Sequence, residues 1–247
     1  MQIAKYNASG NDFVIFHTFN EEDRSALARV LCDRQSGIGA DGLIVLLPSS
    51  EGDFRWQFYN SDGSEASMCG NGTRACAHYA YTNGLAPSFM RFLTGAGMIS
   101  SDVQGDVVET ELTSPRICSE SFEAHGLTWY FYDTGVPHLV TFVDDVARFD
   151  KEIARTMRYA YNANVNYVCV RDKALHVRTY ERGVEDETLA CGTGMAASFY
   201  AAYLLGKVDE RAKVYPTSQE ELYLRIENQK LFFKGHVQKV FEAQWKH

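Results

Sequence analysis

The chain has no excess of basic residues, and this narrows the classes of partner that it can bind. Its 247 residues include 24 lysines and arginines against 32 aspartates and glutamates, which gives a formal net charge of −8. A surface for nucleic acid or for an anionic membrane needs a basic face. We therefore expect a small-molecule partner, with no nucleic acid and no membrane surface.

Long apolar runs and a secretion signal are also absent. No run approaches the roughly 18 apolar residues that a membrane-spanning helix needs. The N-terminal sequence from Met1 to Asn7 has no signal-peptide pattern. These features lead us to expect a cytoplasmic protein.

Closely spaced cysteines are a third absence. The chain has six cysteines, and none belongs to a Cys-x-x-Cys pair. The sequence therefore indicates neither a zinc site nor a thioredoxin-type site, and in a reducing compartment all six should be free thiols. Cys32, Cys76, Cys118 and Cys169 lie in apolar or helical runs, and we interpret them as small core residues.

The other two cysteines belong to an internal repeat. Cys69 and Cys191 each stand in a Cys-Gly-x-Gly turn that leads into a helical pattern, and they lie 122 positions apart. The same offset separates two apolar, β-branched runs, at residues 43–47 and 165–170. This agreement favours a duplicated fold over a coincidence of glycines.

The repeat predicts an α/β (α+β) protein of two pseudo-symmetric domains. The helices expected at 72–84 and 194–206 carry small and aromatic residues nearly all round, which is typical of buried helices. We expect each domain to be a curved, mostly antiparallel sheet wrapped around its central helix. The predicted domains are 1–115 and 116–247, and the last ten or so residues are expected to pack on the first domain.

A cysteine at the start of a helix suits acid and base chemistry. The first backbone N–H groups of a helix have no internal partner and favour negative charge, including that of a thiolate. A free cysteine is only about 3% ionised at pH 7, and a helix N-terminus raises that fraction by lowering the thiol pKa. The same N–H groups would hold a substrate carboxylate; they belong to Gly70, Asn71, Gly192 and Thr193.

Two such thiols suggest inversion at a carbon atom. If one thiolate and one thiol face each other across a cleft, a tetrahedral carbon between them loses a proton to one and gains a proton from the other. The sequence has no signature of a metal, pyridoxal phosphate or flavin, so dipoles and hydrogen bonds must stabilise the carbanion. The two sulfurs would share one proton, and Glu181 and His138 are candidates for influencing which sulfur holds it.

Three segments resemble the signatures of diaminopimelate epimerase. They are Ala-Ser-Gly-Asn-Asp-Phe at 8–13, Met-Cys-Gly-Asn-Gly-Thr-Arg at 68–74 and Glu-Thr-Leu-Ala-Cys-Gly-Thr-Gly at 187–194. With the repeat, the resemblance covers nearly the whole chain. It implies the fold of that family and a cofactor-independent enzyme that interconverts LL- and meso-2,6-diaminopimelate for lysine and peptidoglycan precursor biosynthesis.

The resemblance also implies roles for individual residues, a homodimer and no metal. Cys69 and Cys191 become the two catalytic acid/base residues, and His138 falls where the family has a histidine that influences the thiols. The substrate contacts carry over to Asn11, Asn60, Gly70, Asn71, Asn164, Glu181, Arg182, Gly192 and Thr193. Among these, the planar guanidinium of Arg182 suits the distal carboxylate of the substrate.

The chain departs from the family pattern in three places. Val136 stands where the family usually has asparagine, and Gly42 stands where many members have glutamine. The stretch between Glu181 and Cys191 is one residue longer than in many members, at Glu185-Asp186. We therefore expect some substrate contacts to differ from those of the family and the reaction at the two cysteines to be the same.

Other functions fit the sequence less well. The Gly-x-Gly-x-x-Gly string at 37–42 follows a helical pattern and opens a strand, whereas a dinucleotide-binding fingerprint does the reverse. A proline racemase or hydroxyproline epimerase typically has histidine at the position of Asn71. A non-catalytic amino-acid-binding module would not need both cysteines, and a cysteine hydrolase would leave the second one unexplained.

Overall fold

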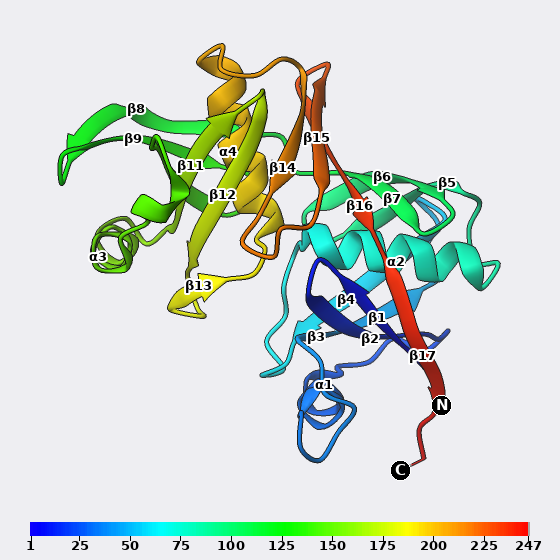
Figure 1. The fold of residues 1–247 in the computed structure, drawn as a ribbon. Coiled ribbons are helices and arrows are strands. Elements are labelled where there is room, and N and C mark those ends of the chain that lie inside the picture. Colours follow the sequence, from blue (N-terminus) through cyan, green and yellow to red (C-terminus); the bar gives the residue numbers. More distant parts are fainter. Residues whose placement is uncertain (247) are drawn as a thin grey trace. The chain divides into compact units, whose positions relative to one another are not determined.

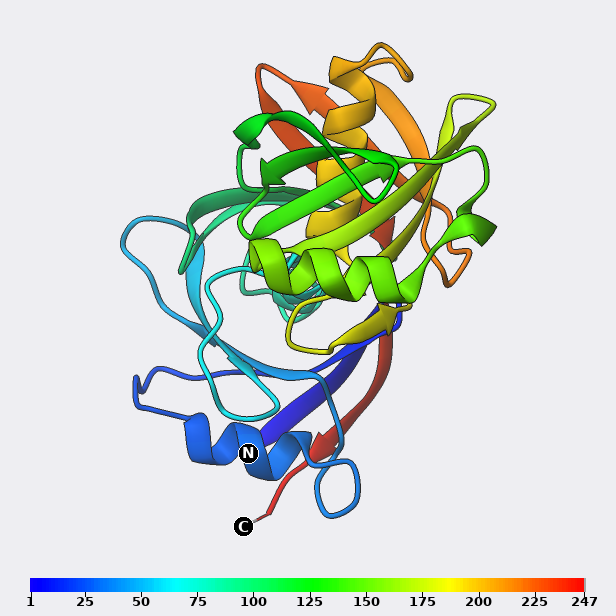
Figure 2. The ribbon, with the colours of Figure 1, turned by 90° about the vertical axis from the view of Figure 1, so that its left-hand side faces the viewer.

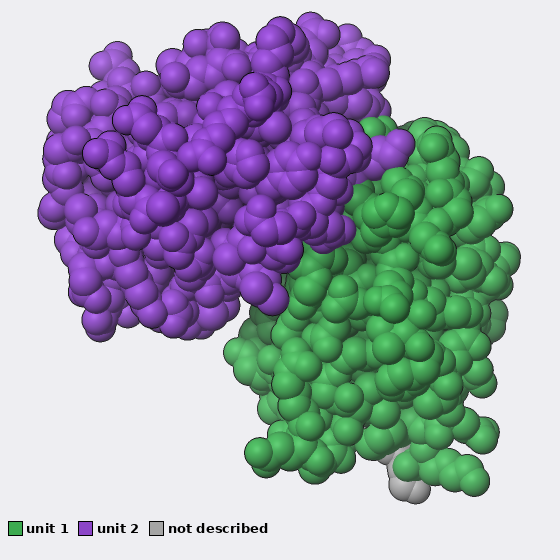
Figure 3. Space-filling view, viewed as in Figure 1, with its two compact units in different colours: residues 1–111, 235–247 green, residues 112–234 purple. Residues whose placement is uncertain are grey.

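The computed structural model describes residues 1–246, which form two compact units. Unit 1 consists of Met1–Glu111 and the C-terminal stretch that begins at Gly235, and unit 2 consists of Leu112–Lys234. Figure 3 colours unit 1 green and unit 2 purple. The second division between the units falls within a single strand, β16 (Lys230–His236).

Unit 1 is a strongly curved sheet with a helix against each face (Figure 1). Its strands, in spatial order, are β17 (Gln238–Gln244), β1 (Gln2–Ala8), β2 (Asn11–His17), β3 (Gly42–Leu47), β4 (Phe54–Asn60), β5 (Phe89–Thr94), β6 (Gly97–Gln104) and β7 (Val107–Glu111). Helix α2 (Gly70–Thr82) packs in the concave core, and α1 (Ser25–Cys32) covers the other face.

The two helices explain the sequence of β3. Every residue of this strand is buried, because successive side chains point to opposite faces and both faces are covered. Ile44 belongs to the core cluster around α2, whereas Leu43 and Val45 belong to the cluster around α1. The continuous apolar run of β3 is therefore explained by a strand that has a helix packed on each of its faces.

Unit 2 repeats this arrangement. Its strands are β8 (Arg116–Ala124), β9 (Leu127–Asp133), β10 (Pro137–Phe142), β11 (Asn164–Arg171), β12 (Ala174–Glu181), β13 (Asp186–Thr188), β14 (Arg211–Tyr215) and β15 (Leu222–Glu227), followed by the first part of β16. Figure 2 shows α3 (Lys151–Tyr161) and α4 (Gly192–Leu204) on opposite sides of these strands. A short 3-10 helix, Val146–Arg148, precedes α3.

Strand pairing makes the repeat explicit. In unit 1 β2 pairs parallel with β3, β3 pairs antiparallel with β4, and β4 pairs parallel with β5. In unit 2 β10 likewise pairs parallel with β11, β11 pairs antiparallel with β12, and β12 pairs parallel with β14. The registers then define three pairs of equivalent positions, which are Phe13 and His138, Ile44 and Asn166, and Phe58 and Thr179.

The central helices begin two residues earlier than the sequence predicted. Gly70 and Gly192 are the first residues of α2 and α4, so each cysteine is the N-cap residue itself. Helix α2 is buried over most of its length. This burial agrees with the lack of a wide polar face in its sequence.

The interpretation of Cys118 as a core residue is wrong. Its side chain is exposed on β8, whereas Cys32, Cys76 and Cys169 are buried as expected. Strand β8 pairs with β9 along one side and its residues are mostly exposed, so an apolar neighbourhood in the sequence does not place Cys118 in a core.

Among residues 1–246, no helix is both long enough and apolar enough to span a membrane.

Candidate active site

Each repeated turn places a cysteine at the N-terminus of a central helix. Cys69 precedes α2 with an extended backbone, and its Sγ accepts a hydrogen bond from the backbone N–H of Gly72 at 3.4 Å. Cys191 precedes α4 in the same way and is 7% exposed. Both cysteines are reduced. The N–H groups of the first helical turn therefore lie beside Cys69 Sγ, whereas Cys191 holds the equivalent N-cap position without a side-chain capping hydrogen bond.

The second glycine of each turn packs closely on the strands beneath it, and at Gly194 there is no room for a Cβ atom. A Cβ atom on Gly194 would lie 2.4 Å from Asn166 Oδ1. A Cβ atom on Gly72 would lie 3.4 Å from Ile44 and 3.5 Å from Phe13. Both turns thus rest directly on the strands beneath them, and the contact is tighter in unit 2.

In unit 1, Asn11 is the predicted substrate-binding residue that contacts the thiol. The Cys69 thiol donates to Asn11 Oδ1 at 3.6 Å, and Asn11 Nδ2 donates to Asp41 Oδ2 at 2.6 Å. Asn71 is buried, and its Oδ1 accepts a hydrogen bond from the fully buried Arg74 at 2.8 Å. Asn60, at the end of β4, donates from its amide to Ser64 Oγ.

Charged residues behind Asn11 form a cluster that sequence reasoning missed. Arg34 donates to both carboxylate oxygens of Asp12 and to Asp41, and Lys5 forms a 2.7 Å ion pair with Asp12. Burial opposes ionisation of Asp12, but hydrogen bonds from Arg34 and Lys5 lower its pKa to about 2. The signal was available, because Asp41 lies inside the glycine string that resembles a dinucleotide-binding fingerprint.

In unit 2, His138 is the centre of a buried polar network. It is fully buried, and its pKa is lowered to about 3 by burial and by the positive charge of Arg182. Its Nδ1 lies 3.1 Å from Asn166 Nδ2, and its Nε2 lies 2.9 Å from Thr193 Oγ1. Thr193 Oγ1 in turn lies 3.6 Å from Cys191 Sγ. A neutral imidazole is therefore linked to the second sulfur through one hydroxyl group.

Asn166 and Thr179 are the members of this network that sequence reasoning did not identify. Thr179 donates to Asn166 Oδ1 at 2.8 Å, and Asn166 Nδ2 donates to the carbonyl of Leu139 at 2.9 Å. The alternation Asn-Val-Asn at the start of β11 was the signal, since it places Asn164 and Asn166 on the same face of a strand.

The remaining predicted residues of unit 2 lie at the ends of β11 and β12. Asn164 Oδ1 accepts a hydrogen bond from the backbone N–H of Arg182 at 2.8 Å. The Arg182 guanidinium donates to the carbonyl of Asn162, and Glu181 accepts from the Thr188 hydroxyl at 2.8 Å. Asn164, Glu181 and Arg182 therefore belong to one corner of the sheet.

Two of the three departures from the family pattern, at Gly42 and at Glu185, have a physical counterpart in the structure. A Cβ atom on Gly42 would lie 2.7 Å from Phe58 and 2.8 Å from the Tyr59 carbonyl, so the backbone leaves no room there for a side chain. Val136 is half-buried. Glu185, in the longer segment, has a positive φ of 60° and binds Arg158 of α3 at 2.6 Å. The longer segment is thus fixed to α3.

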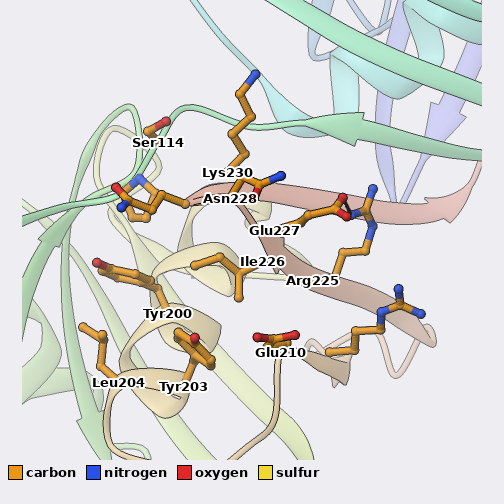
Figure 4. A pocket seen from close by; sticks show the side chains of 13 residues that line it. Ser114, Tyr200, Tyr203, Leu204, Glu210, Arg225, Ile226, Glu227, Asn228 and Lys230 are labelled. Carbon is orange, nitrogen blue, oxygen red and sulfur yellow. Dashed lines mark hydrogen bonds and ion pairs between the residues drawn. The ribbon is translucent and has the colours of Figure 1, made fainter.

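A separate cavity of about 700 Å³ lies in unit 2. Figure 4 shows Tyr200, Tyr203 and Leu204, from the C-terminal part of α4, along its wall. Arginine and lysine side chains line it together with glutamates, and none of its lining residues is a predicted site residue. It is therefore distinct from the turn at the N-terminus of α4.

Among the described residues, there is no group of three or more His, Cys, Asp or Glu side chains that could hold a metal ion.

Comparison with known proteins identifies the family. The family model described as diaminopimelate epimerase matches residues 3–117 and 130–240. The chain is 63% identical to the diaminopimelate epimerase of a Nitratiruptor species, over 98% of each chain. It is 53% identical to that of Campylobacter lari, over 99% of each. The chain belongs to the diaminopimelate epimerase family.

Solved structures confirm the expected fold. A phenazine biosynthesis protein of the PhzF family from Enterococcus faecalis superposes with a TM-score of 0.76 at 13% identity, covering 100% of this chain and 99% of that one. A probable proline racemase from Agrobacterium radiobacter K84 superposes with a TM-score of 0.76 at 11% identity, covering 99% and 92%. The predicted isomerase activity is in turn confirmed by the family membership and the close relatives.

Proposed function

We propose that this chain interconverts LL- and meso-2,6-diaminopimelate, with Cys69 and Cys191 as its two acid/base residues. One observation carries the proposal, namely that a member of this family has a reduced cysteine as the N-cap residue of each of its two central helices. Both cysteines then stand at helix N-termini, where the backbone N–H groups favour a negative charge.

The reaction moves one proton off the α-carbon and another onto it. A thiolate removes the α-hydrogen, so the Cα–H bond breaks and its electron pair stays on the carbon and the adjacent carboxylate. The second cysteine gives its thiol proton to the opposite face, and a new Cα–H bond forms with inverted configuration. The net charge is unchanged, and the two cysteines exchange the roles of thiol and thiolate.

Hydrogen bonds must stabilise the carbanion intermediate. The N–H groups at the starts of α2 and α4, at Gly70, Asn71, Gly192 and Thr193, are suited to the α-carboxylate, where the negative charge develops. The side chains of Asn11, Asn60, Asn164, Glu181 and Arg182 are proposed to bind the rest of the substrate. Among them, the Arg182 guanidinium matches the distal carboxylate in shape and charge.

We also propose that the protein acts in the cytoplasm as a homodimer. The edge strand β17 pairs with β1 and carries two exposed large apolar side chains, Val240 and Phe241, which supports an interface on that strand. Analytical ultracentrifugation should give about twice the chain mass of 27.8 kDa. A Val240→Lys/Phe241→Lys variant should sediment as a monomer, and a wild-type monomer would contradict the dimer.

The activity is tested by replacing each cysteine separately. Purified Cys69→Ala and Cys191→Ala proteins should bind diaminopimelate in calorimetry and lose epimerisation by about a thousandfold, within the range typical of an acid/base residue. Cys118→Ala, at an exposed cysteine, is the matched control and should keep wild-type activity. Proline is the control substrate and should not be racemised. Full activity in either active-site variant would contradict the proposal.

A further inference from the structure

The two cysteine turns rest on chemically different residues. Beneath the turn of unit 1 lie Phe13 and Ile44, and beneath the turn of unit 2 lie their equivalents His138 and Asn166. The turn residue between the glycines also differs. Asn71 is held by Arg74, whereas Thr193 contacts both His138 and Cys191 Sγ.

In unit 2 the hydrogen bonds have a fixed direction that begins at Asn166. Its carbonyl accepts from Thr179 and one amide hydrogen goes to the backbone carbonyl of Leu139, so the orientation of the amide group is determined. The remaining amide hydrogen points to His138 Nδ1 at 3.1 Å. Because an amide nitrogen only donates, Nδ1 must be the acceptor.

The direction continues through His138 to Cys191. A fully buried histidine whose pKa is lowered to about 3 is neutral at physiological pH and has one N–H group. With Nδ1 as acceptor, that hydrogen is on Nε2 and is donated to Thr193 Oγ1 at 2.9 Å. The Thr193 hydroxyl hydrogen is then available to point at Cys191 Sγ, 3.6 Å away. A donor facing a sulfur stabilises the thiolate form.

One further contact at the imidazole is weaker. Asn164 Nδ2 lies 3.4 Å from His138 Nε2 and equally 3.4 Å from the carbonyl of Pro137, while its Oδ1 accepts from the Arg182 backbone. The shorter bonds of His138 to Asn166 and Thr193 therefore determine the tautomer. The charged neighbour that acts on His138 is Arg182, and it opposes protonation of the ring.

In unit 1 the hydrogen bonds run in the opposite direction, so that the group facing the sulfur is an acceptor. The Asp41 carboxylate only accepts, so Asn11 must turn Nδ2 toward it, at 2.6 Å. Asn11 Oδ1 then faces Cys69 Sγ at 3.6 Å and accepts the thiol hydrogen. An acceptor facing a sulfur stabilises the thiol form.

Other groups around Cys69 do not reverse this preference. The Gly72 N–H donates to Sγ at 3.4 Å and taken alone favours a thiolate, but a thiol sulfur accepts the same bond while giving its hydrogen to Asn11 Oδ1. The charged residues behind Asn11 are Asp12, Asp41, Arg34 and Lys5, two of each sign. Their formal charges cancel, and the Asn11 amide presents an acceptor to this sulfur.

We propose that in the free enzyme Cys69 is the thiol and Cys191 is the thiolate, as set by these two oppositely directed hydrogen-bond chains. The assignment of catalytic roles rests on the proposed function. Cys191 then removes the proton from the diastereomer that turns its α-hydrogen toward it, and Cys69 donates. The reverse conversion starts from the form in which the two cysteines have exchanged that proton. Asp41, Asn166 and His138 act as positioning residues, because they orient the groups that contact the two sulfurs.

The test is the pH dependence of alkylation at each cysteine. The reduced full-length enzyme, without substrate, is pulsed with iodoacetamide from pH 5 to pH 10, and modification is quantified by peptide mass spectrometry. Each profile is normalised to its own plateau, which removes the difference in exposure. Cys191 should reach half-maximal alkylation about one pH unit or more below Cys69, a tenfold difference in ionisation. Equal midpoints, or a lower midpoint at Cys69, would overturn the proposal.

The same measurement on Cys69→Ser and Cys191→Ser proteins removes the coupling between the two titrations. The midpoint of Cys191 in the first variant should still lie below that of Cys69 in the second. Loss or reversal of this order would also overturn the proposal.

Variants of the two chains should shift the midpoints selectively. Thr193→Val keeps the shape but removes the donor, and should raise the Cys191 midpoint alone; Thr193→Ser should restore it. Asp41→Asn offers an N–H group to Asn11 and lets its amide rotate, so the Cys69 midpoint should fall, whereas Asp41→Ala should move it less. Thr156→Val, on the exposed face of α3, is the control. Shifts at the wrong cysteine would contradict the assignment.

Failure of this proposal is distinguishable from failure of the proposed function. Alkylation uses no substrate, so the order of the midpoints can hold even if diaminopimelate is not epimerised. Conversely, epimerisation that depends on both cysteines together with equal midpoints would retain the function and reject the assigned protonation states.

Discussion

The two units share a fold and differ in the chemistry beneath the catalytic turn. Phe13, Ile44 and Phe58 of unit 1 are matched by His138, Asn166 and Thr179 of unit 2. Backbone pairing and helix position are the same, so the duplicated scaffold fixes where each sulfur lies. The side chains beneath it determine which hydrogen-bonding group the sulfur meets.

The same contrast extends to the first turn of each central helix. Arg74 lies in α2, fully buried, where the equivalent residue of α4 is Ala196. It donates to Ser9, to Asn71 and to the carbonyl of His236. Unit 1 thus uses a buried cation to hold its turn, whereas unit 2 uses the neutral His138 network.

The largest expected difference concerns the second glycine of each turn. Gly194→Ala places a methyl group 2.4 Å from Asn166 Oδ1, and this amide cannot move without losing its bonds to Thr179 and Leu139. We expect kcat to fall by about 100-fold, as for a displacement of about 1 Å at a catalytic group. Gly72→Ala meets its neighbours at 3.3 Å or more and should cost less than about tenfold, since shifts of a few tenths of an ångström make room for the methyl group.

Steady-state kinetics of the two alanine variants measures this difference, with circular dichroism to verify folding. If Gly72→Ala lost as much activity as Gly194→Ala, the closer packing beneath the turn of unit 2 would not explain the effect on activity.

Removal of the buried cation is expected to destabilise unit 1. Arg74→Ala leaves Ser9, Asn71 and a backbone carbonyl without their charged donor. The free energy of unfolding should decrease by about 3 kcal/mol, given the cost of losing hydrogen bonds from a charged group. Arg91→Ala, at an exposed arginine on β5, should change it by less than about 0.5 kcal/mol.

Urea denaturation of both variants provides the measurement. An Arg74→Ala protein as stable as the Arg91→Ala protein would show that the turn of unit 1 does not depend on its cation.

Acid should affect unit 2 before unit 1. Burial lowers the pKa of His138 to about 3, so the unfolded chain binds a proton more readily and stability falls as the pH drops below about 6.5. The stabilisation from Asp12, whose pKa is lowered to about 2, is complete above about pH 4 and is lost as the pH falls through 2. Burial also lowers the pKa of His78 in unit 1, but Asp106 opposes that shift.

Hydrogen exchange at pH 7 and pH 5, corrected for the intrinsic rates, compares the two units directly. Amides of β10 and β11 should lose more protection than those of β1 and β2. The opposite order would contradict the assignment of His138 as the most acid-sensitive group.

The smallest expected effect concerns Val136. The register makes it the equivalent of Asn11 in the repeat, so Val136→Asn restores an amide at the matching position. Because the side chain is half-buried and stands two residues before His138, we expect KM for diaminopimelate to change by about threefold, equivalent to about 0.7 kcal/mol. A change in kcat larger than that in KM would place this residue in the chemical step.

Much of the fold could be predicted from the sequence because the same sequence pattern occurs in both halves of the chain. The common offset of the cysteines and the apolar runs identified the repeat, and the Cys-Gly-x-Gly turns located α2 and α4 to within two residues. The helix starts were missed by two residues because a cysteine is an unusual N-cap residue. Cys118 was misplaced because edge exposure depends on strand pairing and not on local hydropathy.

The polar groups behind the sulfurs were harder to predict. Asp41 and Asn166 come from strands or loops remote in sequence from their cysteines, and their roles follow from strand register and from the direction of each hydrogen bond. The predicted division into domains 1–115 and 116–247 stays a prediction, and β16 passes from one compact unit to the other.

The two-thiol mechanism is tested most directly by epimerising LL-diaminopimelate in deuterium oxide and analysing the earliest product. If one cysteine removes the proton and the other supplies a new one, the first meso product should carry deuterium at the inverted carbon, while unreacted substrate keeps its hydrogen. Early product that retains the original hydrogen would mean that a single group moves the proton between faces, and would contradict the assignment of two acid/base residues.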